Sequence, residues 1–65
     1  MRTEKFTGEV SAELRLYTKA GLAHAIGLIV PQDKRRRVLG YKLASVEAIS
    51  GDALKKAVTI AVMYQ

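Results

Sequence analysis

The sequence predicts a small α+β domain with a three-stranded antiparallel sheet followed by a C-terminal helix, in the order β-β-β-α. Two stretches, residues 5–18 and 37–45, alternate apolar and polar side chains. This period of two is typical of strands with one buried face. Near the C-terminus, apolar residues recur at intervals of three and four, as in an amphipathic helix. With 65 residues in the chain, all these elements are assigned to one domain, residues 1–65.

The first strand is expected over residues 5–18. Every second residue from Phe6 to Leu16 is apolar or small, and the residues between them are polar. Because this run is longer than the usual strand of about 5–6 residues, we expect a bend or bulge, with Gly8 as its position. Lys19–Gly21 ends the alternation and predicts a turn.

The second strand is expected over residues 23–30, which are apolar on both faces. Periodicity alone does not distinguish a helix from a strand in such a run. The β-branched residues and Gly27 favour a strand, and a helix over the same residues is the alternative. Pro31–Lys34 has the composition of a turn. With a third strand at 37–45, the two strands would form a hairpin whose tip is Pro31–Arg36.

The C-terminal segment, residues 52–64, is interpreted as the helix. Ser50 is a good N-cap, and Asp52 places a negative charge in the first turn, where the helix dipole favours it. The apolar residues at helical spacing are Leu54, Ala57, Val58, Ala61 and Val62. The run from Val58 to Val62 also fits a strand, so this alternative stays open.

An internal similarity offers a second architecture. Residues 12–30 align without gaps with residues 44–62, and many apolar positions correspond. If this similarity reflects a duplication, the chain would fold as two similar β-α-β or β-α halves around a pseudo-twofold axis.

No group of residues indicates catalysis, and we expect a protein that is not an enzyme. The chain has no Cys and one His, which excludes a disulfide framework, a thiolate zinc site and a cysteine nucleophile. Glu9 and Glu13 would lie about 13 Å apart along a strand, too far to act as an acid–base pair. The glycines show neither P-loop nor dinucleotide-binding spacing. No metal site or cofactor is therefore expected.

The basic cluster Lys34–Arg37 is the strongest local feature. Arginine forks bind phosphate oxygens bidentately, and counterion release adds affinity for nucleic acid. The polar face of the first strand would add cations and a tyrosine suited to base stacking. The candidate nucleic-acid-binding residues are Lys34, Arg35, Arg36, Arg37, Arg15, Tyr17, Lys19 and Lys42. The alternative interpretation of the cluster is a solvated turn that keeps the chain soluble.

The net charge is +5, from 11 Lys and Arg against 6 Asp and Glu. It favours a non-catalytic nucleic-acid-binding protein, with DNA ahead of RNA. The alternative is a small protein-interaction or inhibitor module, or a structural subunit of an oligomer, whose positive tip is steered to an acidic protein surface.

Size and hydropathy add two expectations. A chain this short buries only about 60% of its extended surface, so a homodimer is expected to supply further burial. The longest uncharged run, Ala20–Gln32, is shorter than the roughly 20 residues of a membrane-spanning helix. We therefore expect no membrane segment and a cytoplasmic location.

Overall fold

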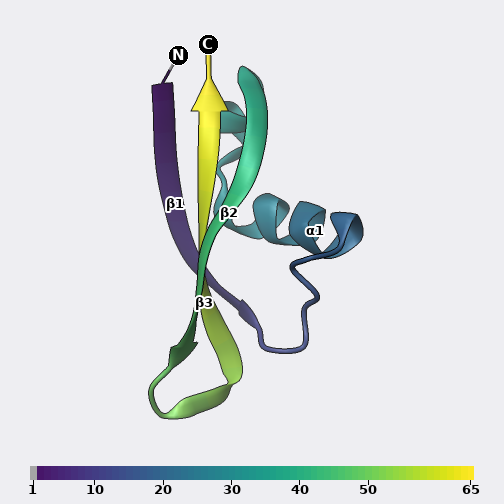
Figure 1. Ribbon diagram of the computed structural model, residues 1–65, viewed down its shortest axis with the longest axis vertical. Helices are drawn as coiled ribbons and strands as arrows, with labels where there is room; N and C mark the ends of the chain where they lie inside the picture. The colour runs from purple at the N-terminus through teal and green to yellow at the C-terminus, as the bar shows by residue number, and fades with distance from the viewer. Residues whose placement is uncertain (1) are drawn as a thin grey trace.

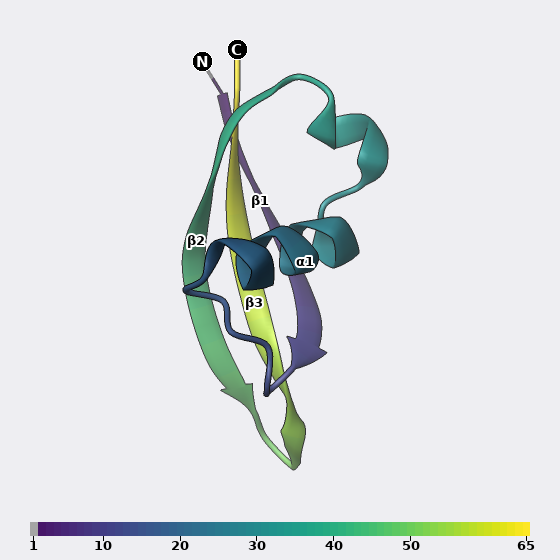
Figure 2. The same ribbon diagram turned by 90° about the vertical axis from the view of Figure 1, so that its right-hand side faces the viewer.

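The computed structural model describes residues 2–65 and shows a three-stranded antiparallel sheet with one helix lying across a face (Figures 1 and 2). The elements are β1 (Arg2–Ser11), α1 (Lys19–Ile29), the 3-10 turn η1 (Gln32–Arg35), β2 (Val38–Ile49) and β3 (Asp52–Tyr64). Their order in the sheet is β1-β3-β2, so the last strand lies between the first two. Because β1 and β2 are both antiparallel to β3, they run parallel to each other and α1 forms the crossover between them.

The predicted order β-β-β-α is therefore wrong, since the helix lies between β1 and β2 and not at the C-terminus. The alternative of two similar β-α-β halves is wrong as well. Residues 22–29 are helical, whereas the aligned residues 54–61 belong to a strand. The three-stranded antiparallel sheet and the single helix are present, with two segments exchanged in type.

The C-terminal segment is a strand because it is the middle of the sheet. Val58, Ile60 and Val62 are completely buried on the face that α1 covers. These residues pair with residues of both neighbouring strands: Ile60, for example, pairs with Phe6 of β1 and with Leu43 of β2. The face of β3 away from α1 also carries small apolar residues, Ala57 and Ala61, which blur its period of two. The helical spacing seen in the sequence follows from this blurring.

Residues 19–29 form the helix where a strand was predicted. Thr18 begins it as the N-cap, since its hydroxyl accepts a hydrogen bond from the Gly21 amide at 3.0 Å and donates one to the Arg15 carbonyl at 2.8 Å. Gly21 and Ala25 are the buried residues of the helix. At Gly21 the helix lies against the backbone carbonyl of Arg15 in the preceding loop, where a Cβ would clash. Pro31 follows its end and cannot continue it.

The first strand ends at Ser11, earlier than the alternation predicts. Leu14 and Leu16 still pack against the core from the following loop, so apolar residues continue at the same spacing without a strand. Gly8 pairs with Val58 in an unbroken register, so the bulge predicted there is wrong. The irregularities lie in the pairing of β2 with β3.

Gly8 is instead a point of close approach between β1 and α1. A Cβ placed on Gly8 would lie 2.8 Å from Cγ1 of Ile29 on α1. The missing side chain therefore leaves the space into which the helix packs.

Within residues 2–65, no helix has the length and apolar character needed to cross a membrane.

We predict that Gly8→Ala lowers the free energy of unfolding by about 1–3 kcal/mol, because the new methyl group overpacks the contact with Ile29. Urea denaturation measures the change. In a double-mutant cycle, Gly8→Ala should lower the free energy of unfolding much less in an Ile29→Ala background than in the parent chain.

Gly27→Ala is the matched control, because a Cβ there meets only Nη1 of Arg35, at 4.0 Å. It should stabilise the helix by about 0.5–1 kcal/mol. Equal losses at Gly8 with and without the Ile29 side chain would contradict the proposed contact.

Candidate anion-binding site

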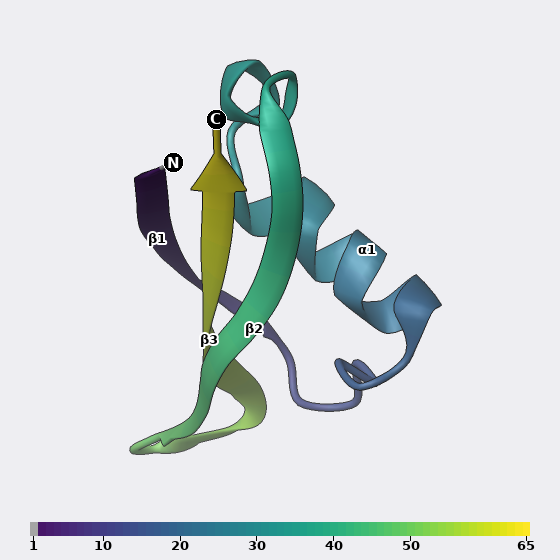
Figure 3. The same cartoon turned by 45° about the horizontal axis from the view of Figure 1, so that its top comes forward.

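The basic segment Lys34–Arg37 connects α1 to β2 and is not a hairpin tip. The predicted tip, Pro31–Arg36, contains η1, in which the Lys34 amide donates a hydrogen bond to the Pro31 carbonyl at 3.0 Å. Figure 3 shows this turn at the same end of the molecule as the two chain termini. The four cations are all exposed. The hairpin tip was predicted because residues 23–30 were assigned to a strand. Since residues 19–29 form a helix, the basic segment joins a helix to β2 and does not join two paired strands.

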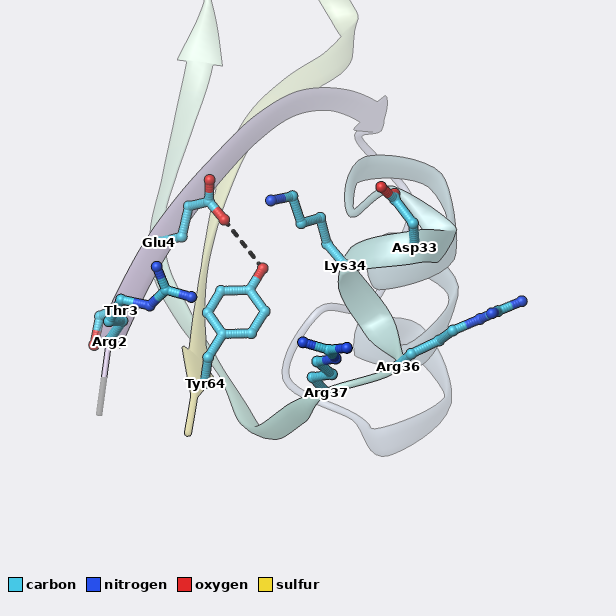
Figure 4. A pocket seen from close by; sticks show the side chains of 8 residues that line it. All are labelled: Arg2, Thr3, Glu4, Asp33, Lys34, Arg36, Arg37 and Tyr64. Carbon is cyan, nitrogen blue, oxygen red and sulfur yellow. Dashed lines mark hydrogen bonds between the residues drawn. The ribbon is translucent and has the colours of Figure 1, made fainter.

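A pocket of about 630 Å³ lies between this segment and the ends of β1 and β3. The side chains that line it are drawn in Figure 4 and are Arg2, Thr3, Glu4, Asp33, Lys34, Arg36, Arg37 and Tyr64. Lys34 and Arg37 extend from the η1 side toward Tyr64, and the guanidinium of Arg2 lies on the other side of this ring (Figure 4). Arg36 extends away from the others. Cations from two distant parts of the chain thus face one concave surface.

The strand order brings Arg2 to the basic segment. Tyr64 of the central strand pairs with Arg2 on one side and with Val38 on the other. Arg37 directly precedes Val38, so it lies across Tyr64 from Arg2. Without knowing that β3 lies between β1 and β2, sequence reasoning had no signal for including Arg2 or Tyr64 in the site.

The carboxylates near the pocket leave its cations without ion pairs. The Tyr64 hydroxyl donates a hydrogen bond to Oε2 of Glu4 at 3.1 Å. Among residues 2–65, no Lys or Arg nitrogen lies within 4.0 Å of a carboxylate oxygen. Asp33 and Glu4 line the same pocket, so they reduce its positive potential without neutralising a particular cation by contact.

The other predicted binding residues lie elsewhere. Nη1 of Arg35 is close to Gly27, so this side chain runs back along α1. Lys42 lies on β2, and Arg15 and Tyr17 lie in the loop before α1. Lys19 is the first residue of α1.

The expectation that Arg15, Tyr17 and Lys19 share a strand face is wrong, because β1 has already ended at Ser11. Tyr17 is 89% exposed, and it lines a separate hollow with Lys19 and part of β2. The length of α1, about 16 Å at 1.5 Å per residue, separates this group from η1. In the described chain, no group of three or more metal-ligating side chains could hold a metal ion.

Tyr64 gives the pocket a measurable titration. Burial of the ring and the hydrogen bond with Glu4 raise the pKa of Tyr64 above its ordinary value of 10.0. The fold therefore favours the neutral phenol. The stabilisation this provides is complete below pH 10 and is lost as the pH rises through the pKa of the folded state.

We predict that Glu4→Gln lowers the pKa of Tyr64, because it removes the negative charge beside the phenol. The measurement is a ¹³C NMR titration of tyrosine Cζ, with Tyr64→Phe assigning the resonance. Tyr64→Phe should also reduce the loss of unfolding free energy at alkaline pH relative to the parent chain. An unchanged Tyr64 titration in Glu4→Gln would contradict the contact.

Comparison with known proteins assigns this chain to no family. No family model, curated protein or solved structure matches it.

Proposed function

We propose that the protein is a non-catalytic nucleic-acid-binding protein that holds backbone phosphates at the pocket on which Arg2, Lys34 and Arg37 converge, with Arg36 beside them as a further cation. The supporting observation is the convergence of Arg2 from β1 with Lys34 and Arg37 from the η1 segment on one concave surface. These cations have no carboxylate within contact distance in the described chain. A phosphate group supplies what they lack, since guanidinium forks bind its oxygens bidentately and Lys adds a point charge.

The pocket favours duplex DNA over single-stranded RNA. Binding of single strands commonly uses exposed aromatic rings on which bases stack. The aromatic ring in this pocket, Tyr64, is buried, and its hydroxyl is engaged by Glu4. Tyr17 is exposed but lies away from the pocket. The available groups therefore suit a phosphate backbone better than unstacked bases.

The expected binding is weak and depends on salt. Nonspecific complexes that rely on phosphate contacts have dissociation constants of about 10⁻⁴ to 10⁻⁶ M at physiological salt. Asp33 and Glu4 oppose the approach of a polyanion, which places the affinity at the weak end of this range. An acidic protein surface is the alternative ligand, because it offers carboxylates to the same cations.

We predict that the triple variant Lys34→Ala/Arg36→Ala/Arg37→Ala binds a labelled DNA duplex at least about tenfold more weakly at low salt. Each lost phosphate contact should also make the log–log salt dependence shallower by about 0.9. Fluorescence anisotropy at several salt concentrations measures both quantities. Arg2→Ala should weaken binding in the same direction, although it lies far away in the sequence.

Arg15→Ala/Lys19→Ala/Lys55→Ala is the matched control, because it removes three exposed cations that do not line the pocket. It should retain most of the affinity and the salt slope. Equal losses in both triple variants would show that net charge alone drives binding. Competition by polyglutamate as effective as competition by DNA would favour an acidic protein as the ligand.

A further inference from the structure

The face of the sheet opposite α1 has a regular pattern of small and charged residues. Directly paired residues of neighbouring strands point to the same side of a sheet. The row Phe6–Ile60–Leu43 belongs to the core under α1. The rows that alternate with it therefore point to the other side, which we call the open face; it is the far side of the sheet in Figure 2, where α1 lies in front.

Four rows make up the open face. Taken from the chain termini toward the Ser50–Gly51 turn, in the order β1, β3, β2, they are Thr3–Met63–Gly40, Lys5–Ala61–Lys42, Thr7–Thr59–Ser45 and Glu9–Ala57–Glu47. The middle strand contributes three small residues and a methionine. Both lysines and both glutamates are on the outer strands, and all four are exposed.

The charges on this face are arranged symmetrically about its central row. The lysine row lies on one side of Thr59 and the glutamate row lies at the same interval on the other. The two charged rows are four positions apart along β3, from Ala57 to Ala61, which is about 13 Å, so a lysine of one row cannot pair with a glutamate of the other within one chain. The central row is neutral, and Thr7 and Thr59 share a hydrogen bond of 2.9 Å between their hydroxyls.

A second copy of the same chain is complementary to this pattern. Consider a twofold axis that lies between the two sheets and runs parallel to the row Thr7–Thr59–Ser45. It rotates the second copy so that its open face meets the open face of the first and its strands run in the opposite direction. Two sheets stacked in this way, about 10 Å apart, place the lysine row of each copy over the glutamate row of the other. Lys5 then faces Glu9, and Lys42 faces Glu47, and the twofold symmetry repeats each contact. An axis along the strands would instead oppose lysine to lysine.

We propose that the open face is a homodimer interface in which two sheets stack with this twofold axis. Ala57, Thr59 and Ala61 let the two middle strands approach closely, and Ala61 is already only 8% exposed in the single chain. Such an isologous contact uses the same patch on both copies. The pocket shares Thr3 with the open face, while its cations Lys34, Arg36 and Arg37 belong to the η1 segment and lie outside the four stacked rows.

The footprint of four rows of three residues is small beside the roughly 800 Å² per partner of a standard interface. The dimer is therefore expected to dissociate in the micromolar range or above. Its stability should fall as salt is added, because the four interfacial ion pairs are at the edges of the contact.

The test reverses the charge of Lys42 alone, the charge of Glu47 alone, and then both charges in one variant. Lys42→Glu and Glu47→Lys each place like charges opposite each other at two symmetry-related contacts, and each should raise the dimer dissociation constant by about tenfold or more at low salt. The double variant Lys42→Glu/Glu47→Lys exchanges the two charges, so it restores the complementarity and should dimerise nearly as well as the parent chain. Sedimentation velocity over a concentration series measures the constants.

Lys19→Glu, on α1, makes the same change in net charge away from the open face and should leave the dissociation constant unchanged. A parent chain that stays monomeric throughout the series would overturn the proposal. A dimer insensitive to both Lys42 and Glu47 would also overturn it and would indicate a contact through another surface, such as the outer edge of β1 or β2. Since none of these residues lines the pocket, the result is independent of whether DNA binds there.

Discussion

The fold depends on the burial of one face of β3 between two neighbouring strands and a helix. Val58, Ile60 and Val62 have no exposed surface, and burial of each such side chain contributes about 1.5–3 kcal/mol. A domain of 65 residues has few other residues that are buried to this extent. The strand must therefore occupy the middle of the sheet, and α1 must cross over it to join β1 to β2.

This central position also creates the site and the open face. It brings Arg2 and Arg37 to the two sides of Tyr64, although they lie at opposite ends of a crossover connection. It also aligns the lysines of β1 and β2 in one row and their glutamates in another, with small residues of β3 between them. The anion pocket and the proposed dimer interface share Thr3, but the η1 cations of the pocket and the charged rows of the interface are different residues, so the same strand order supplies both.

Local sequence patterns predicted the strands that have one buried face and one solvent-exposed face. The alternation around Phe6 and around Leu43 correctly indicated two strands, which turn out to be the outer ones of the sheet, and the basic segment was recognised from its composition. The two apolar segments were assigned the wrong way round. Residues 19–29 are helical because Thr18 caps them and because Gly21 and Ala25 suit close packing, whereas residues 52–64 form the central strand, which carries Ala57 and Ala61 on the face away from α1. These decisions depend on contacts between distant segments, which periodicity within one segment does not report.

The most direct test of the account is the position of β3, measured by NMR on the intact chain. Cross-strand nuclear Overhauser effects should connect the backbone of Ile60 to that of Phe6 and to that of Leu43, and the Cα shifts of residues 52–64 should be those of a strand. The amides of Val58 and Val62 should be among the slowest to exchange with solvent. Helical shifts over residues 52–64, or a direct pairing of β1 with β2, would contradict the strand order on which both the pocket and the open face depend.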